Sequence, residues 1–281
     1  MIDRNTRKRS IHSAGNLSRS LFLSILGILT FLPFVFALII SFKDIFQYTH
    51  HPFKPTFPLM WSNYVIAYKL VIKYIFNSIL VSGVSAVFVI LLGVFSGYVF
   101  ARYDFPFKNT LFFFFLALMM IPTVLSLVTR FILVMNLGLR DNYLGMILPY
   151  ISGGQIMVIF VSRTFFENIP NSLFESAKID GASDVHMLFN IAIPLSLAII
   201  WTLVIMNIIS TWNNILWPLV IINKVELMPI SIGLLHFKGQ TQSNVGAMMA
   251  GYLIASIPLL IVFVVASKQF VRGLTSGAVK L

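Results

Sequence analysis

The sequence predicts an all-α integral membrane protein with six transmembrane helices. The chain has 281 residues, of which 58% are hydrophobic and 10% are charged, and its mean hydropathy is +0.91. This composition is too apolar for an ordinary soluble domain. Several uncharged runs also reach about 20 residues, the length at which a helix spans the hydrocarbon core of a bilayer. Together these observations favour a chain that crosses the membrane repeatedly.

The first predicted helix covers residues 21–41, an uncharged run between Arg19 and Lys43. Its apolar stretch is too long for a signal peptide and no small-x-small cleavage site follows, so we expect an uncleaved transmembrane helix. Residues 1–20 form a polar, basic tail in which we expect little order. Residues 42–74 form the longest outer loop, and its three prolines prevent a continuous helix there.

Five further helices are predicted between residues 75 and 267, the region that we expect to form the main transmembrane domain. They follow the remaining uncharged runs, which are residues 75–101, 110–129, 143–162, 194–223 and 239–267. The fourth of these runs is longer than one span needs, so its polar stretch at residues 210–214 requires its own explanation. In the first of them, Gly93 and Gly97 form a G-x-x-x-G pattern, which favours close helix packing. Residues 268–281 then form a C-terminal tail.

The formal net charge of +11 would suit nucleic-acid binding, but many basic residues flank the predicted spans. Basic residues near the ends of spans orient a membrane protein with its positive side in the cytoplasm. The cluster before the first span places the N-terminus there, and an even number of spans returns the C-terminus to the same side. We therefore expect membrane lipid around the chain and no nucleic-acid partner. The pattern is imperfect, because four lysines would lie outside: Lys43, Lys54, Lys69 and Lys73.

A polar segment at residues 163–193 separates two apolar ones and predicts two short helices joined by a turn. Ser172, followed three residues later by Glu175, forms a capping-box pattern at the start of the first. An Asp-Gly pair at residues 180–181 ends that helix, since glycine tolerates a positive φ. Ser183 is the expected N-cap of the second. By capping and amphipathicity alone, the segment could also be a hairpin that merely lies on the membrane. The second helix has an apolar face at Val185, Leu188, Phe189 and Ala192, and Pro194 opens the next span.

The spacing in this segment resembles the EAA loop of bacterial ABC importer permeases, whose pattern is E-A-A, three residues, G, nine residues and I-x-L-P. The matching positions are Glu175, Ala177, Gly181, Ile191 and Pro194. Ser176 replaces the second residue of the triplet and Ile193 replaces the leucine. The stretch TWNNILWPLVI at residues 211–221 and the C-terminal RGLTSGAVKL resemble the maltose-type, carbohydrate-importer branch of that family. The resemblance covers the chain from about residue 76 onward.

In that family the loop docks onto a cytoplasmic ATPase subunit. The resemblance therefore implies that Glu175 meets a basic partner, that Gly181 permits the sharp turn, and that Ala177 keeps the surface flat. Asp180 is either a turn residue or a partner contact. The implied ATPase-coupling residues are Ser172, Glu175, Ala177, Asp180, Gly181, Ile191 and Pro194.

The resemblance also implies a type I importer permease fold in the bacterial plasma membrane and import of a sugar by alternating access. The implied partners are a second homologous permease subunit, two cytoplasmic ATP-binding subunits and an extracellular sugar-binding protein. The sequence contains no G-x-x-x-x-G-K-[ST] loop for ATP phosphates. We therefore expect a transport subunit, not an enzyme, and no cofactor.

No ionisable residue lies near the middle of a predicted span, which argues against a proton-coupled carrier. The spans instead offer amide, hydroxyl and aromatic groups, which suit a sugar. The candidate substrate-pathway residues are Asn207, Thr211, Trp212, Asn213, Asn214 and Trp217. The two tryptophans could alternatively form an interfacial aromatic belt. The serines of the second predicted helix (Ser78, Ser82 and Ser85) favour helix packing.

Three other interpretations remain. A permease of the same branch could carry a non-sugar solute such as a glycerol phosphate ester, but that solute would need a basic cavity, of which the sequence gives no sign. The chain could also be a membrane scaffold or an intramembrane enzyme, although no catalytic set of residues is evident. His50 and His51 invite a metal site, but consecutive residues cannot easily share one ion, and we expect none.

Overall fold

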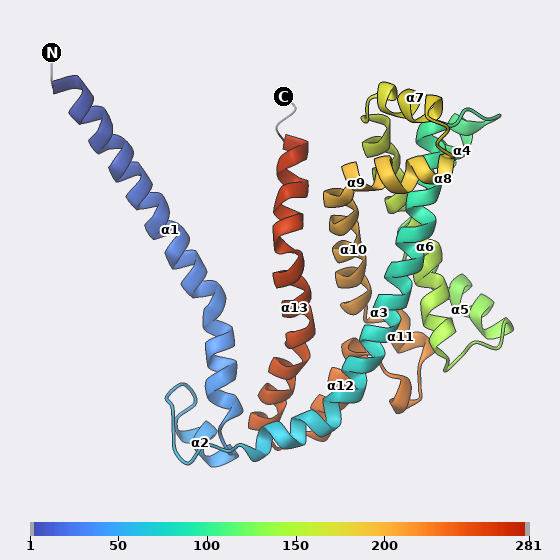
Figure 1. The fold of residues 1–281 in the computed structure, drawn as a ribbon. Coiled ribbons are helices and arrows are strands. Elements are labelled where there is room, and N and C mark those ends of the chain that lie inside the picture. Colours follow the sequence, from blue (N-terminus) through green and yellow to red (C-terminus); the bar gives the residue numbers. More distant parts are fainter. Residues whose placement is uncertain (1–2, 279–281) are drawn as a thin grey trace. The chain divides into compact units, whose positions relative to one another are not determined.

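The computed structural model describes the backbone of residues 3–278 and the side chains of residues 19–265. Over this part the chain is helical and contains no β-strand, which confirms the predicted all-α class (Figure 1). The chain divides into two compact units, Met1–Lys69 with Lys238–Ile254 and Leu70–Phe237 with Ala255–Leu281. The second unit contains the polar segment and most of the candidate residues.

The first half of the chain contains α1 (Asp3–Ser41), α2 (Ile45–His50), α3 (Ser62–Arg102), α4 (Lys108–Met119), α5 (Leu127–Asn136) and α6 (Tyr143–Glu167). The second half contains α7 (Asn171–Ile179), α8 (Asp184–Met187), a π-helical turn (Leu188–Ala192), α9 (Ile193–Leu195), α10 (Leu197–Trp212), α11 (Leu216–Ile221), a 3-10 turn (Val225–Leu227), α12 (Ile230–Gln240) and α13 (Val245–Ala278).

Among the described residues, four helices are long and apolar enough to cross a membrane: Arg19–Ser41 within α1, all of α3, all of α6, and Val245–Val265 within α13. A fifth span results if α10 and the preceding segment Asp184–Leu195 are counted as one broken span, bent by 81°. The chain is therefore a multi-pass membrane protein. The remaining predicted span, residues 110–129, is divided between the short apolar helices α4 and α5. Pro122 lies in the break, where its missing N–H cannot continue a helix.

Several helix ends differ from the prediction. The expected N-terminal tail is helical from Asp3 onward, and α13 continues through residues 268–278 of the expected C-terminal tail. Residues 1–2 and 279–281 lie outside the described part. The outer loop is also shorter than predicted, because α3 begins at Ser62. The Asn63 side chain donates to the carbonyls of Ser41 (2.9 Å) and Lys43 (2.8 Å), which ties the start of α3 to the end of α1.

Within the second unit, α3 and α6 approach each other closely. An added Cβ at Gly93 would lie 2.5 Å from Val158, and one at Gly97 would lie 2.7 Å from Ser162 and 3.1 Å from the Arg163 backbone nitrogen. The predicted packing role of the G-x-x-x-G pattern is therefore confirmed. In Figure 1, α7 and α8 lie at the upper end of this helix pair, and α5 and α11 lie toward its lower end.

Candidate functional site

The α7–α8 hairpin corresponds to the predicted docking loop, but α7 begins differently from the prediction. Its N-cap is Pro170, and no side chain caps the helix. Ser172 lies inside the first turn, where its carbonyl accepts from Ser176 Oγ at 2.9 Å. The predicted capping box with Glu175 is therefore wrong. Pro170 takes the N-cap position with a non-helical ψ of 131°, so the first helical residue is Asn171.

The end of α7 agrees with the prediction. Gly181 has a φ of +79°. Its N–H donates to Lys178 O (3.1 Å) and the Ala182 N–H donates to Ala177 O (2.9 Å), which is the Schellman arrangement of a helix end. Ser183 then caps α8 by accepting from the His186 N–H at 3.2 Å. The turn of the hairpin is thus held by hydrogen bonds within the hairpin itself.

Beyond α8 the chain passes through the π-helical turn and bends sharply into α10. Leu188 and Ala192 are buried, but Val185 and Phe189 are 61% and 49% exposed, so only half of the predicted apolar face is covered within this chain. Pro194 lies within α9. The bend follows at Ser196, whose N–H donates to the Ala192 and Ile193 carbonyls (both 3.1 Å).

Arg102, at the end of α3, anchors the start of the hairpin. Its guanidinium donates to Asn171 Oδ1 (2.6 Å) and Ile169 O (2.7 Å), and also to Phe166 O. The same group lies 3.9 Å from the ring centroid of Phe174, which is the buried residue of α7. The ends of α3 and α6 and the beginning of α7 are therefore held together by one side chain. Arg102 directly follows the uncharged run 75–101, so sequence reasoning counted it only among the basic residues that flank the spans and missed this role.

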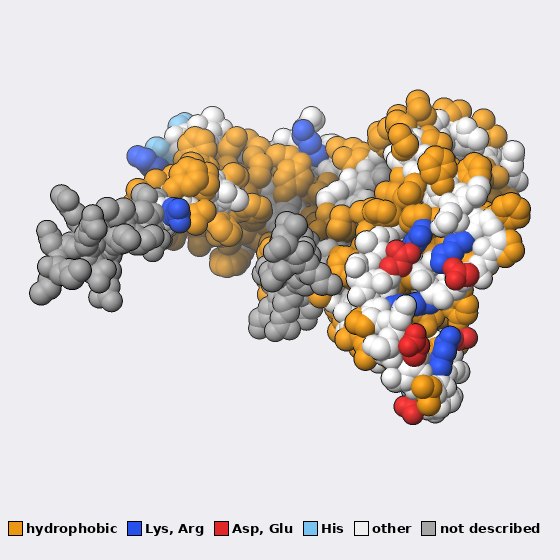
Figure 2. Space-filling view, turned by 90° about the horizontal axis from the view of Figure 1, so that it is seen from above, with side chains coloured by type: hydrophobic (Ala, Val, Ile, Leu, Met, Phe, Trp, Pro, Cys, Tyr) orange, Lys and Arg blue, Asp and Glu red, His pale blue; other side chains and the backbone are white. Residues whose placement is uncertain are grey.

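The outer surface of the hairpin is charged and exposed. Figure 2, seen from the side of α7 and α8, shows Lys, Arg, Asp and Glu side chains gathered there, with apolar side chains around them. Glu175, Lys178 and Asp180 are all exposed. A small cavity of about 240 Å³ lies beneath α7 and includes Tyr103 and Asp184 in its lining. Burial, together with the hydrogen bond to Asp184, raises the pKa of Tyr103 to about 12, so its hydroxyl stays a proton donor.

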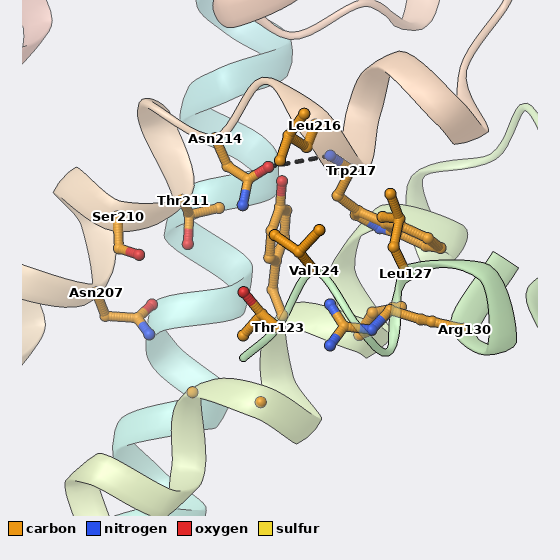
Figure 3. A pocket seen from close by; sticks show the side chains of 14 residues that line it. Thr123, Val124, Leu127, Arg130, Asn207, Ser210, Thr211, Asn214, Leu216 and Trp217 are labelled. Carbon is orange, nitrogen blue, oxygen red and sulfur yellow. Dashed lines mark hydrogen bonds between the residues drawn. The ribbon is translucent and has the colours of Figure 1, made fainter. Parts of the chain in front are cut away.

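A second cavity, of about 250 Å³, lies toward the other end of the unit, among α5, α6, α10 and α11. It is lined by Thr123, Val124, Leu127, Arg130, Pro149, Tyr150, Gly153, Gly154, Asn207, Ser210, Thr211, Asn214, Leu216 and Trp217. Figure 3 shows Asn207 and Arg130 reaching into it from opposite sides. Four of the six candidate pathway residues line this cavity. Trp212 and Asn213 do not.

The polar stretch at the end of α10 has a structural role as well. Helix α10 stops at Trp212, and the Asn214 side chain accepts from the Trp217 backbone N–H at 3.1 Å where α11 begins. The Trp217 indole N–H donates to Gly145 O at 3.2 Å. Trp217 is only 2% exposed and Trp212 only 7%, so neither forms an aromatic belt at a lipid-facing surface. The long apolar run is thus two helices joined at a polar break.

Arg130 was missed by sequence reasoning, which expected no basic group in a cavity. It follows the uncharged run 110–129 directly and so counted as lying beyond a span. The break at Pro122 instead places it inside the second short helix, α5, with its side chain lining the cavity. The proline within the apolar run was the available signal.

Comparison with known proteins identifies the family. Residues 89–276 match the family described as "binding-protein-dependent transport system inner membrane component". The chain is 30% identical over 225 residues to the arabinooligosaccharides transport system permease protein AraQ of Bacillus subtilis (strain 168), covering 79% of each chain. It is 26% identical over 255 residues to the diacetylchitobiose uptake system permease protein NgcG of Streptomyces coelicolor (strain ATCC BAA-471 / A3(2) / M145), covering 89% of this chain and 84% of NgcG.

The fold is similar to that of a chain in the crystal structure of a bacterial ABC transporter involved in the import of the acidic polysaccharide alginate. The TM-score is 0.76 at 22% identity, with 96% of this chain and 99% of that chain covered. The sequence match covers more than half of this chain and reaches from the middle of α3 to the last turn of α13. The chain therefore belongs to the family of binding-protein-dependent transport system inner membrane components, the membrane subunits of ABC importers.

Proposed function

We propose that this chain is a permease subunit that carries a sugar or oligosaccharide across the bacterial plasma membrane. The observation that carries the proposal is the match to saccharide permeases over most of their length. The cavity supports it, because amide, hydroxyl and aromatic groups surround a space of about 250 Å³. This volume is close to that of the smallest ligand pockets, about 300 Å³. ATP hydrolysis belongs to a separate subunit in this family.

We further propose that the α7–α8 hairpin is the site where that ATPase docks. Two backbone hydrogen bonds close its turn, its outer face is exposed and charged, and Arg102 binds it to the end of α3. Helix α6 lines the cavity with residues up to Gly154 and ends at Glu167, just before α7. At 1.5 Å per residue the two sites are about 20 Å apart along one helix. A movement of the hairpin would therefore reach the cavity directly, as alternating access requires.

The proposed assembly contains a second homologous permease, two ATP-binding subunits and an extracellular sugar-binding protein. The family description supports the binding protein, since transport in this family depends on one. Six spans with both termini in the cytoplasm would place the hairpin on the ATPase side. In that arrangement the pair α4 and α5 together supplies the third span.

The test is purification of tagged protein in mild detergent, with its partners identified by mass spectrometry. We expect a second permease and an ATPase to copurify. The complex, reconstituted into vesicles with its binding protein, should then take up a saccharide only when ATP is supplied to the ATPase. Recovery of the chain alone from intact membranes, or equal uptake without ATP, would contradict the proposal.

A further inference from the structure

The cavity between α5, α6, α10 and α11 contains a cation without a matching anion. Arg130 donates to Ser126 Oγ at 3.1 Å, and its guanidinium carbon lies 5.7 Å from the ring centroid of Trp217. The ion pairs among the described residues are Lys108–Asp104 and Arg163–Glu167, so Arg130 takes part in neither. No acidic residue lines the cavity. A partly buried charge is costly unless it is paired or used, which points to an anion from outside this chain.

Two further polar atoms of the same cavity have no partner. Tyr150 Oη and Asn207 Oδ1 are buried and make no hydrogen bond among the described residues. Leaving such atoms unpaired costs free energy, and native proteins rarely do so without a reason. A phenol can donate to a carboxylate, and an amide oxygen can accept from a hydroxyl. The cavity thus offers a cation, a donor and an acceptor at once.

The remaining lining residues fix the shape of this site. Asn214 and Trp217 use their hydrogen bonds to hold α11 in place, and Gly154 allows Asn207 to lie close to α6. An added Cβ at Gly154 would lie 2.8 Å from Asn207 Nδ2. Asn207 is therefore held against one wall, while Arg130 reaches in from the other (Figure 3).

We infer that this cavity binds a sugar unit that carries a carboxylate, with Arg130 as its counter-ion. The guanidinium presents paired N–H groups that match the two carboxylate oxygens. Asn207 Oδ1 accepts from a ring hydroxyl, and Tyr150 donates to the same sugar. A carboxylate is favoured over a phosphate ester, because the cavity supplies one cation whereas a phosphate carries a charge of about −1.5 to −2. The inference rests on the proposed permease function and specifies its substrate class.

The test uses the complete complex with its binding protein, reconstituted into vesicles and driven by ATP. A panel of oligouronides and their neutral, carboxyl-reduced counterparts is first screened against the binding protein, and uptake of each is then measured. We expect uptake of oligouronides by the unaltered chain. Arg130→Gln should reduce oligouronide uptake by about tenfold or more, since hydrogen bonds to charged groups are among the stronger ones. Arg130→Lys should retain part of the oligouronide uptake, because lysine keeps the positive charge but lacks the paired N–H groups of the guanidinium.

The matched control is Arg140→Gln, which removes an exposed arginine that does not line the cavity, and it should leave uptake unchanged. Tyr150→Phe keeps the ring and removes only the unpaired hydroxyl, so it tests the site even if the Arg130 variants do not assemble. We expect a severalfold loss of oligouronide uptake from it. Uptake of neutral saccharides alone, or an equal loss of both forms in Arg130→Gln, would overturn the inference and leave the permease function standing. Absence of ATP-driven saccharide uptake altogether would instead refute the proposed function.

Discussion

Helices α7 and α5 end in the same way at opposite ends of one unit. Gly181 follows α7 with a φ of +79°, and Gly138 follows α5 with a φ of +68°. At each end, the N–H groups of the glycine and of the next residue donate to carbonyls in the last turn of the helix. The second of these hydrogen bonds measures 2.9 Å after α7 and 3.0 Å after α5. An added Cβ would meet nothing within 4 Å at either glycine. The two helix ends are therefore chemically equivalent within this chain.

Their surroundings differ. Beyond Gly181 the chain forms the exposed, charged hairpin, whereas beyond Gly138 it reaches Asp141, which is tied to the loop after α11. The Asp141 N–H donates to Ile221 O at 3.2 Å, and its carboxylate accepts from the Lys224 N–H at 3.0 Å. The turn at Gly181 thus lies on the proposed docking face, whereas the turn at Gly138 leads into a segment bonded to the loop after α11 at the cavity end of the unit. The same local motif serves docking in one place and internal support in the other.

The largest expected effect comes from the matched pair Gly181→Asp and Gly138→Asp. Both force a side chain into a left-handed conformation, at a cost of about 1–2 kcal/mol. Only the first places a new carboxylate on the proposed docking face, so we expect it to abolish ATP-driven uptake while the protein stays in the membrane. Gly138→Asp should retain most uptake. Normal uptake by Gly181→Asp would show that the hairpin does not couple to the ATPase.

The next largest effect is expected from a substitution that pushes α3 away from α6. These two helices connect the docking hairpin to the cavity end of the unit. Gly97→Leu would drive a side chain against Ser162 and against α6 backbone atoms 3.1–3.2 Å from its Cβ. We expect a loss of about 1–3 kcal/mol in stability, read as a lower unfolding temperature in detergent. Gly83→Leu, on the same helix but facing open space, is the control. Equal losses from the two variants would contradict the packing role.

A smaller effect is expected from Arg102→Gln, which removes three hydrogen bonds and the contact with Phe174. The hairpin would lose its anchor but keep its own turn. We expect uptake to fall severalfold, with copurification of the ATPase weakened but not lost. Lys108→Gln removes the i,i+4 pair with Asp104 (3.2 Å), whose carboxylate is fully exposed, and such pairs contribute only about 0.3–0.5 kcal/mol. Little change in that control is expected, and a greater loss there than in Arg102→Gln would count against the anchor.

The smallest expected effect is a pH dependence of stability, and it arises from Asp141 at the cavity end of the unit. Backbone N–H groups of Asn223 and Lys224 lower the pKa of Asp141 below its ordinary value. The resulting stabilisation is fully present above the usual aspartate pKa of about 4 and is lost as the pH falls through the lowered value. Unfolding temperatures of the unaltered chain and Asp141→Asn, measured from pH 6 to pH 3, should converge at the acid end. A gap that stays constant would contradict the role of this carboxylate.

Local sequence was enough for features whose cause is local. Glycine at position 181 predicted the end of α7, and Ser183 predicted the cap of α8, because both act through the backbone within a few residues. Uncharged runs predicted a multi-pass helical chain, since the length of a span depends only on the bilayer. The capping box at Ser172 failed because Pro170 starts the helix earlier, and two local signals competed there.

The chain's own sequence thus determined its fold class, its spans of uninterrupted helix and the turn of its proposed docking hairpin. Only the tertiary structure decided that Arg102 holds that hairpin, and that Arg130, Tyr150 and Asn207 share one cavity. These residues come from helices far apart in the chain, and their contacts depend on how closely α3, α6 and α10 pack. Helix periodicity and composition record which residues are apolar, whereas the distance between two helices depends on the side chains that both present at their contact.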